Sequence, residues 1–141
     1  MSWFSKNKKK IGFGDLELSI TTLFIHAARL DENYSLDEKK IITKCLTKLG
    51  FGDQNEISEL IKQCEILEEE GNQILHLTQQ IKKLEYSERL KIIEMLVEVM
   101  YADKKIDEFE DNLIRRVSGL VYIENVDLGI IRENTKKKLN L

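Results

Sequence analysis

The sequence predicts an all-α protein of about seven helices, in which two duplicated helical hairpins enclose a pseudo-twofold core. The 141 residues include no proline, the usual breaker of helices. Apolar residues recur at three- and four-residue steps, and no stretch alternates cleanly with period two. Glycine and capping residues must therefore mark where each helix ends.

The chain divides by charge into a basic tail and an acidic body. Residues 1–14 contain no acid, and we expect them to form a flexible basic tail that carries Trp3 and Phe4. Residues 15–141 form one helical domain with a net charge of −7, although the whole chain carries only −3. The basic charges of the tail are Lys6, Lys8, Lys9 and Lys10.

The start of the domain predicts two helices joined by a short loop. The first helix runs from Asp15 to about Asp31. Ser35 and Glu38 have the spacing of a capping box, which begins the second helix, and Gly50 is a natural residue to end it. The apolar stripe of the first helix consists of Leu16, Ile20, Leu23, Phe24, Ala27 and Leu30.

A third helix is predicted to begin at Asp53 and Glu56, which repeat the capping-box spacing. It ends in the acids of 68–70, and because acids oppose the dipole at a carboxyl end, we expect that end to be exposed and frayed. A shorter helix should follow over about 72–84.

Three helices are predicted in the second half of the chain. Ser87 caps the fifth helix, which is apolar nearly all round, so it should pack at the centre beside the first. Asp107 and Glu110 give another capping box for the sixth helix. The last helix begins near Asn125 and ends in the lysines of 136–138, which suit the dipole.

The two halves of the domain resemble each other. A shift of 72 residues aligns 18–50 with 90–122 without a gap and matches thirteen apolar pairs. This pattern favours duplicated hairpins, although two unrelated amphipathic hairpins can also be brought into register. The identical pairs are Leu18 with Leu90, Ile20 with Ile92, Asp31 with Asp103, Glu38 with Glu110, and Ile42 with Ile114.

The second hairpin carries a recognisable motif. The segment 101–110 reads YADKKIDEFE and is followed by LIRRV at 113–117. It resembles the ADGxxDxxE…IRR hairpin of the TerB-like family, the tellurite-resistance domain also found in a membrane-anchored DnaJ-type co-chaperone. Glu32 and Lys104 stand where the family usually has glycine, and Ser35 replaces an acid. The resemblance implies an all-helical domain for stress and metal-oxyanion resistance, with acids that chelate metal and no known reaction.

The metal site that the resemblance implies is an acidic corner in each hairpin. Its candidate ligands are Asp103, Asp107 and Glu110, paralleled by Asp31 and Glu38. Hard oxygen ligands of this kind hold Ca²⁺, Mg²⁺ or Mn²⁺, and we expect weak binding because the protein ligands are few. The structural alternative is a set of capping boxes and Asx-turns, which leaves unexplained why an acid follows a helix end twice.

Other titratable residues offer weaker candidates. His26 and His76 lack the spacing of a paired metal motif, and we interpret His26 as a satisfied histidine at the edge of the core. Glu94 and Glu98 lie four residues apart on the fifth helix. They form either a paired-carboxylate site or, as we prefer, the narrow solvent edge of that helix.

Composition narrows the class of protein. Cys45 and Cys64 form no CxxC motif, and we expect buried, reduced thiols in a cytoplasmic protein. No apolar run approaches the roughly 20 residues of a membrane span. The acidic body argues against nucleic acid as a partner.

The sequence therefore predicts a non-enzymatic TerB-like domain of the stress response that binds a divalent cation or a protein partner not identified by the sequence. The alternative is a peripheral membrane adaptor, whose basic aromatic tail makes weak, reversible contact with anionic lipid.

Overall fold

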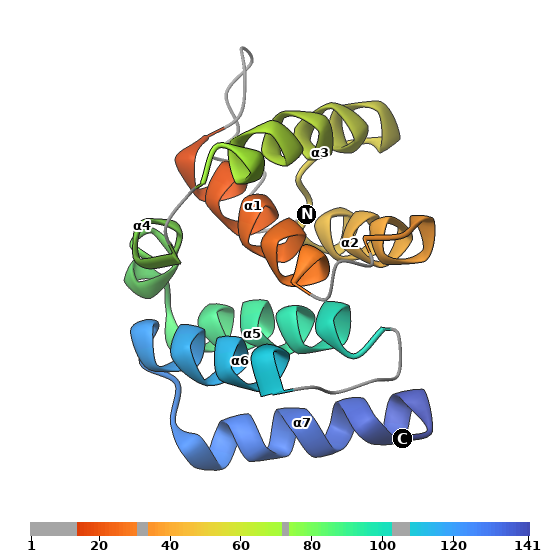
Figure 1. Ribbon diagram of the computed structural model, residues 1–141. Helices are drawn as coiled ribbons and strands as arrows, with labels where there is room; N and C mark the ends of the chain where they lie inside the picture. The colour runs from red at the N-terminus through yellow and green to blue at the C-terminus, as the bar shows by residue number, and fades with distance from the viewer. Residues whose placement is uncertain (1–13, 31–33, 72–73, 103–107) are drawn as a thin grey trace.

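The computed structural model describes residues 14–30, 34–71, 74–102 and 108–141. These residues form seven α-helices and a 3₁₀ turn, with no strand among them, which confirms the all-α prediction (Figure 1). The elements are α1 (Asp15–Arg29), α2 (Leu36–Leu49), α3 (Gln54–Glu69), α4 (Ile74–Thr78), η2 (Ile81–Lys83), α5 (Tyr86–Met100), α6 (Glu108–Leu120) and α7 (Asn125–Leu139).

Helices α1 and α5 lie at the centre, as their apolar composition predicts. Helix α1 contacts α2, α3, α4 and α5, while α5 contacts α1, α2, α6 and α7. In Figure 1, α1 lies between α3 and α5, and α7 forms the outer edge of the molecule below α5 and α6. The fully buried residues of these two helices include Ile20, Leu23, Phe24, Ile25, Ile92, Ile93, Leu96 and Val97.

The two hairpins correspond in detail. Shifted by 72 residues, α1 and α2 overlap α5 and α6 to within one residue at each described end. Gly50 ends α2 with φ 79°, and its counterpart Tyr122 follows α6 with φ 59°, so both turns need a left-handed residue. Equivalent hydrogen bonds close both turns: Phe51 N donates to Leu46 O at 3.1 Å, and Ile123 N donates to Ser118 O at 2.9 Å.

Helix boundaries follow the predicted caps, with two corrections. The predicted helix over 72–84 is wrong in length, because α4 ends at Thr78, whose hydroxyl bonds back to Leu75 O at 3.0 Å. Helix α5 begins before Ser87, since Glu85 N donates to Glu88 Oε1 at 3.1 Å and takes the capping position. Glu85, and not the predicted Ser87, is therefore the N-cap of α5.

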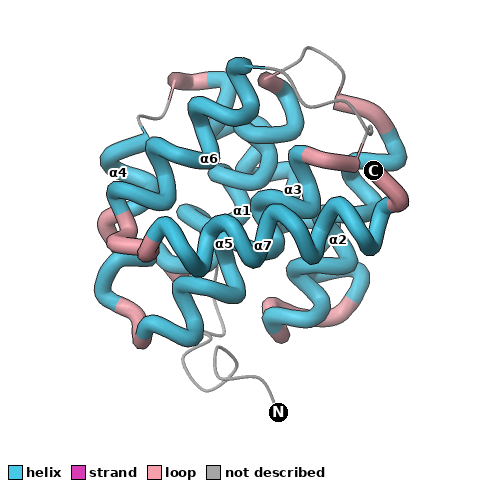
Figure 2. Tube along the Cα trace, turned by 90° about the horizontal axis from the view of Figure 1, so that it is seen from below, coloured by secondary structure: helices cyan, strands magenta, loops and turns pink. Residues whose placement is uncertain are grey.

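Seen at right angles to Figure 1, α7 crosses the front of the molecule with α5 behind it (Figure 2). Helix α7 packs on α5 through Leu128, Ile131 and Thr135, each less than a tenth exposed. Within the described helices, none has the length and apolarity needed to cross a bilayer. The predicted tail, residues 1–13 in particular, lies outside the described residues.

Candidate functional site

The structure describes two of the five candidate metal ligands. Glu38 and Glu110 occupy equivalent places in the first turns of α2 and α6, and their residues are only 5% and 3% exposed. The other three, Asp31, Asp103 and Asp107, lie outside the described residues. The two described glutamates are thus buried at equivalent positions of the two hairpins.

Glu38 belongs to a completed capping box. Ser35 N donates to Glu38 Oε1 at 3.1 Å, and Glu38 N donates to Ser35 Oγ at 3.4 Å. Ser35 Oγ also lies 3.3 Å from the same carboxylate oxygen. At the first hairpin the structural interpretation of the sequence therefore accounts for the glutamate.

Glu110 has different surroundings. Tyr101, fully buried at the end of α5, lies close to it, and burial raises the pKa of Tyr101 while Arg132 opposes that rise. The neighbouring Asp111 accepts a hydrogen bond from Arg132, and its Oδ2 forms an ion pair with Arg115 Nε at 3.0 Å. The second corner thus combines a buried carboxylate with a second carboxylate that arginines already neutralise.

A cluster that sequence reasoning missed joins the carboxyl ends of α1 and α3. Arg29 Nη1 lies 2.5 Å from Glu68 Oε1, and His26 Nδ1 lies 3.2 Å from Glu68 Oε2. The predicted exposure of this end is wrong for Glu68, whose side chain is 16% exposed, and confirmed for Glu69 at 67%. The predicted fraying is not seen at Glu69, which is the last residue of α3. The positive charge of Arg29 on α1 compensates the acids that oppose the dipole of α3. His26 is satisfied at the core edge, as predicted.

The same cluster continues to the loop before α2. The Tyr34 ring centroid lies 5.0 Å from the Arg29 guanidinium carbon and 5.1 Å from Lys39 Nζ, so two cations contact the ring. Lys39 Nζ pairs with Glu65 Oε2 at 2.9 Å. Burial raises the pKa of Tyr34, and Glu65 raises it further. Because cations of the chain neutralise these carboxylates, the cluster is a structural brace.

Glu94 and Glu98 have separate roles. Glu94 is exposed, as the solvent-edge interpretation predicts, whereas the Glu98 side chain is 17% exposed and its Oε1 lies 2.6 Å from Lys138 Nζ. Cys45 Sγ lies 3.8 Å from the other oxygen of Glu98. Glu98 therefore ties α5 to α7, and Cys45 is a buried thiol, as predicted.

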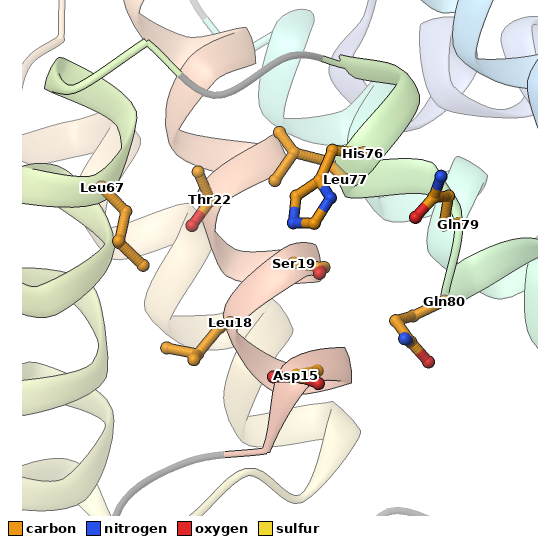
Figure 3. A pocket seen from close by; sticks show the side chains of 9 residues that line it. All are labelled: Asp15, Leu18, Ser19, Thr22, Leu67, His76, Leu77, Gln79 and Gln80. Atoms are coloured by element: carbon orange, nitrogen blue, oxygen red, sulfur yellow. The ribbon is translucent and has the colours of Figure 1, made fainter.

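A cleft of about 260 Å³ with a mixed polar and apolar lining opens between α1, the end of α3 and the α4–η2 segment (Figure 3). Ser19 and Thr22, both buried, line it from α1. In Figure 3, Leu67 lies on one side of Thr22 and His76 on the other. The sequence gives no signal for this cleft, because its walls come from helices that are distant along the chain. Its remaining lining residues are Asp15, Leu18, Leu77, Gln79 and Gln80.

Within the described ranges, no three His, Cys, Asp or Glu side chains are grouped so that they could hold a metal ion. Any cation site at the second corner must therefore draw on Asp103 or Asp107 together with Glu110. The oxygen donors available there fit a hard cation, not a soft one.

We compared the chain with protein families, curated proteins and solved structures. No curated protein and no solved structure matches the chain. The family described as tellurite resistance protein TerB matches residues 17–133, which include most of α1, all of α2 to α6 and most of α7. The chain therefore belongs to the TerB family and carries a tellurite-resistance-like domain.

Proposed function

We propose that this TerB-family domain acts by binding, not by turnover, and that its second hairpin binds a divalent cation. The observation that carries the proposal is the burial of Glu110, 3% exposed, in the first turn of α6, which Asp103 and Asp107 precede in the sequence. A buried carboxylate that follows two further acids in the sequence supplies the hard oxygen donors that a divalent cation binds.

The two hairpins are not equivalent candidates. In the first hairpin, Glu38 is engaged by Ser35, which replaces the second acid of the family motif. In the second hairpin, Asp107 stands at the position that corresponds to Ser35. The proposal therefore assigns the cation to the second hairpin and a capping role to the first.

Isothermal titration calorimetry of the full chain with Ca²⁺, Mg²⁺ and Mn²⁺ tests the assignment. We expect a dissociation constant of about 10⁻⁴ to 10⁻³ M, the range of weak Ca²⁺ modules. Asp103→Asn should abolish the binding heat, while its matched control in the first hairpin, Asp31→Asn, should leave it unchanged. Equal responses of wild type and Asp103→Asn would show that the acids serve only as caps.

A second candidate function is that of a peripheral membrane adaptor. Four lysines lie within residues 6–10, next to Trp3 and Phe4, and no acid occurs before Asp15. Such a segment favours anionic lipid, and the acidic body would then face away from the surface. This function needs the tail and tolerates neutral hairpin corners, so it is separable from cation binding by experiment.

A further inference from the structure

Helix α7 carries a second apolar face, opposite the one that packs on α5. Val126 is 73% exposed and Ile130 is 54% exposed, and their four-residue spacing places them on one outer ridge. Glu133 and Lys137 continue this ridge toward the carboxyl end, and both are exposed. In Figure 2 the helix runs across the face of the molecule turned to the viewer. The ridge is thus presented to solvent.

The ridge is held rigidly by contacts on its inner side. These contacts join the start, middle and end of α7 to α5 and α6, so little order must be gained when another surface docks. They are the hydrogen bond of 2.5 Å from Tyr86 Oη to Asp127 Oδ2, the pair of Arg132 with Asp111, and the pair of Lys138 with Glu98 at 2.6 Å.

Gly129 gives the ridge an opening for a close approach. It lies inside α7, is exposed, and a Cβ added there would meet no atom within 4 Å. Glycine inside a helix costs about 1 kcal/mol relative to alanine, and packing within this chain does not require it. Its effect is a flat surface between Val126 and Ile130, where a second helix can approach the backbone.

The charges at the two ends of α7 indicate what kind of helix can pack on the ridge and in which direction it runs. Asp127 and Lys138 are already bound to Tyr86 and Glu98, so the charges offered to a partner are the exposed Glu124 at the amino end of α7 and the exposed Lys137 in its last turn. A parallel copy of this helix would place like charges together, whereas an antiparallel copy places acid against base and opposes the two dipoles. The same surface is therefore complementary to itself, as a twofold interface requires.

We propose that a second copy of this chain docks on α7 in an antiparallel, twofold-symmetric dimer. Ile130 meets its own counterpart near the axis, beside Gly129. Lys137 of one copy reaches toward Glu124 of the other, near the exposed ring of Tyr122. A 15-residue helix is about 22 Å long, and its ridge buries less than the roughly 1,200 Å² of standard interfaces, so the dimer is weak and reversible.

Sedimentation equilibrium of the full chain tests the proposal, at protein concentrations from about 10 µM to about 1 mM, where weak complexes populate. The wild-type mass should rise toward that of a dimer. Ile130→Glu should weaken the dimer by at least about tenfold, as expected for a central contact. The matched control is Ile66→Glu on α3, where the native side chain is 58% exposed, and it should associate like wild type.

A charge exchange tests the direction of the helices. Glu124→Lys and Lys137→Glu should each weaken association, and the double variant should recover it. Circular dichroism checks that each variant is folded. If Ile130→Glu is not folded, Val126→Glu replaces it in the experiment. The proposal is wrong if wild type stays monomeric at the highest concentration, if Ile130→Glu associates like wild type, or if Ile66→Glu is equally disruptive. Absence of recovery in the double variant contradicts the antiparallel arrangement.

Discussion

Arg29 Nη1 donates a 2.5 Å hydrogen bond to Glu68 Oε1, and this contact joins the carboxyl ends of α1 and α3 across 39 residues of sequence. Arg29 also donates to the backbone oxygen of Glu65 at 3.2 Å. The side chains of Arg29 and Glu68 are largely shielded from solvent, at 23% and 16% exposed. Loss of one partner of this pair should therefore destabilise the fold more than loss of an exposed surface ion pair does.

We predict that Glu68→Gln lowers the free energy of unfolding by about 1–3 kcal/mol, since a charged hydrogen bond is lost and Arg29 keeps a shielded charge. Urea denaturation followed by circular dichroism measures the change. The matched control is Lys62→Ala, which removes the exposed pair of Lys62 with Glu59 at 3.8 Å. This control should change stability by less than about 0.5 kcal/mol. A Glu68→Gln effect no larger than that of the control would contradict the brace.

The same carboxylates predict an acid-sensitive fold. Burial raises the pKa of Glu68, but hydrogen bonds from Arg29 and His26 outweigh it and leave the pKa below the ordinary 4.5. Burial also raises the pKa of Glu65, but hydrogen bonds from Lys39 and, to a lesser extent, Tyr34 outweigh it and lower the pKa. A lowered folded pKa gives stability that is complete above the unfolded value and lost as pH falls through the folded value.

The urea midpoint should therefore fall steadily below about pH 4.5, where unfolded glutamates take up protons. Glu68→Gln should flatten this fall, because it removes one of the two groups responsible. An identical slope in wild type and variant would show that Glu68 does not contribute to the acid sensitivity.

Both cysteine thiols should be unreactive in the folded protein. Burial, followed by the charge of Glu98, raises the pKa of Cys45 to about 12, and burial raises that of Cys64 to about 11. At pH 8 about one thiol in a thousand or fewer is then ionised. Dithionitrobenzoate should label both cysteines at once in guanidinium chloride and only slowly in native buffer. Equal rates in the two conditions would refute the prediction.

The membrane alternative predicts salt-dependent lipid binding through the tail. Each lysine near an anionic surface contributes about 1 kcal/mol, so four lysines give at most roughly 4 kcal/mol. The full chain should sediment with phosphatidylserine vesicles at low salt and be released at high salt, because screening weakens the attraction. A truncated protein that starts at Gly14 should stay in solution. Equal sedimentation of the two proteins at low salt would exclude the tail.

The sequence alone determined the helices and most of their ends. The box of Ser35 and Glu38 and the left-handed Gly50 depend on residues within one turn of each other, so their spacing was readable. The 72-residue repeat predicted two matching hairpins, whose helix ends and closing turns agree, and the twofold relation between them stays a prediction. At the candidate site, the sequence predicted two acidic corners, of which the structure describes Glu38 and Glu110, both buried.

Tertiary structure alone decided which side chains contact each other and which helix faces are exposed to solvent. The satisfied state of Glu68 depends on Arg29, and the outer ridge of Val126 and Ile130 depends on which side of α7 packs on α5. Neither relation leaves a local pattern, since burial and ion pairing over dozens of residues follow from how the helices stack. A helix with apolar residues on two faces is explained only when its neighbours are known.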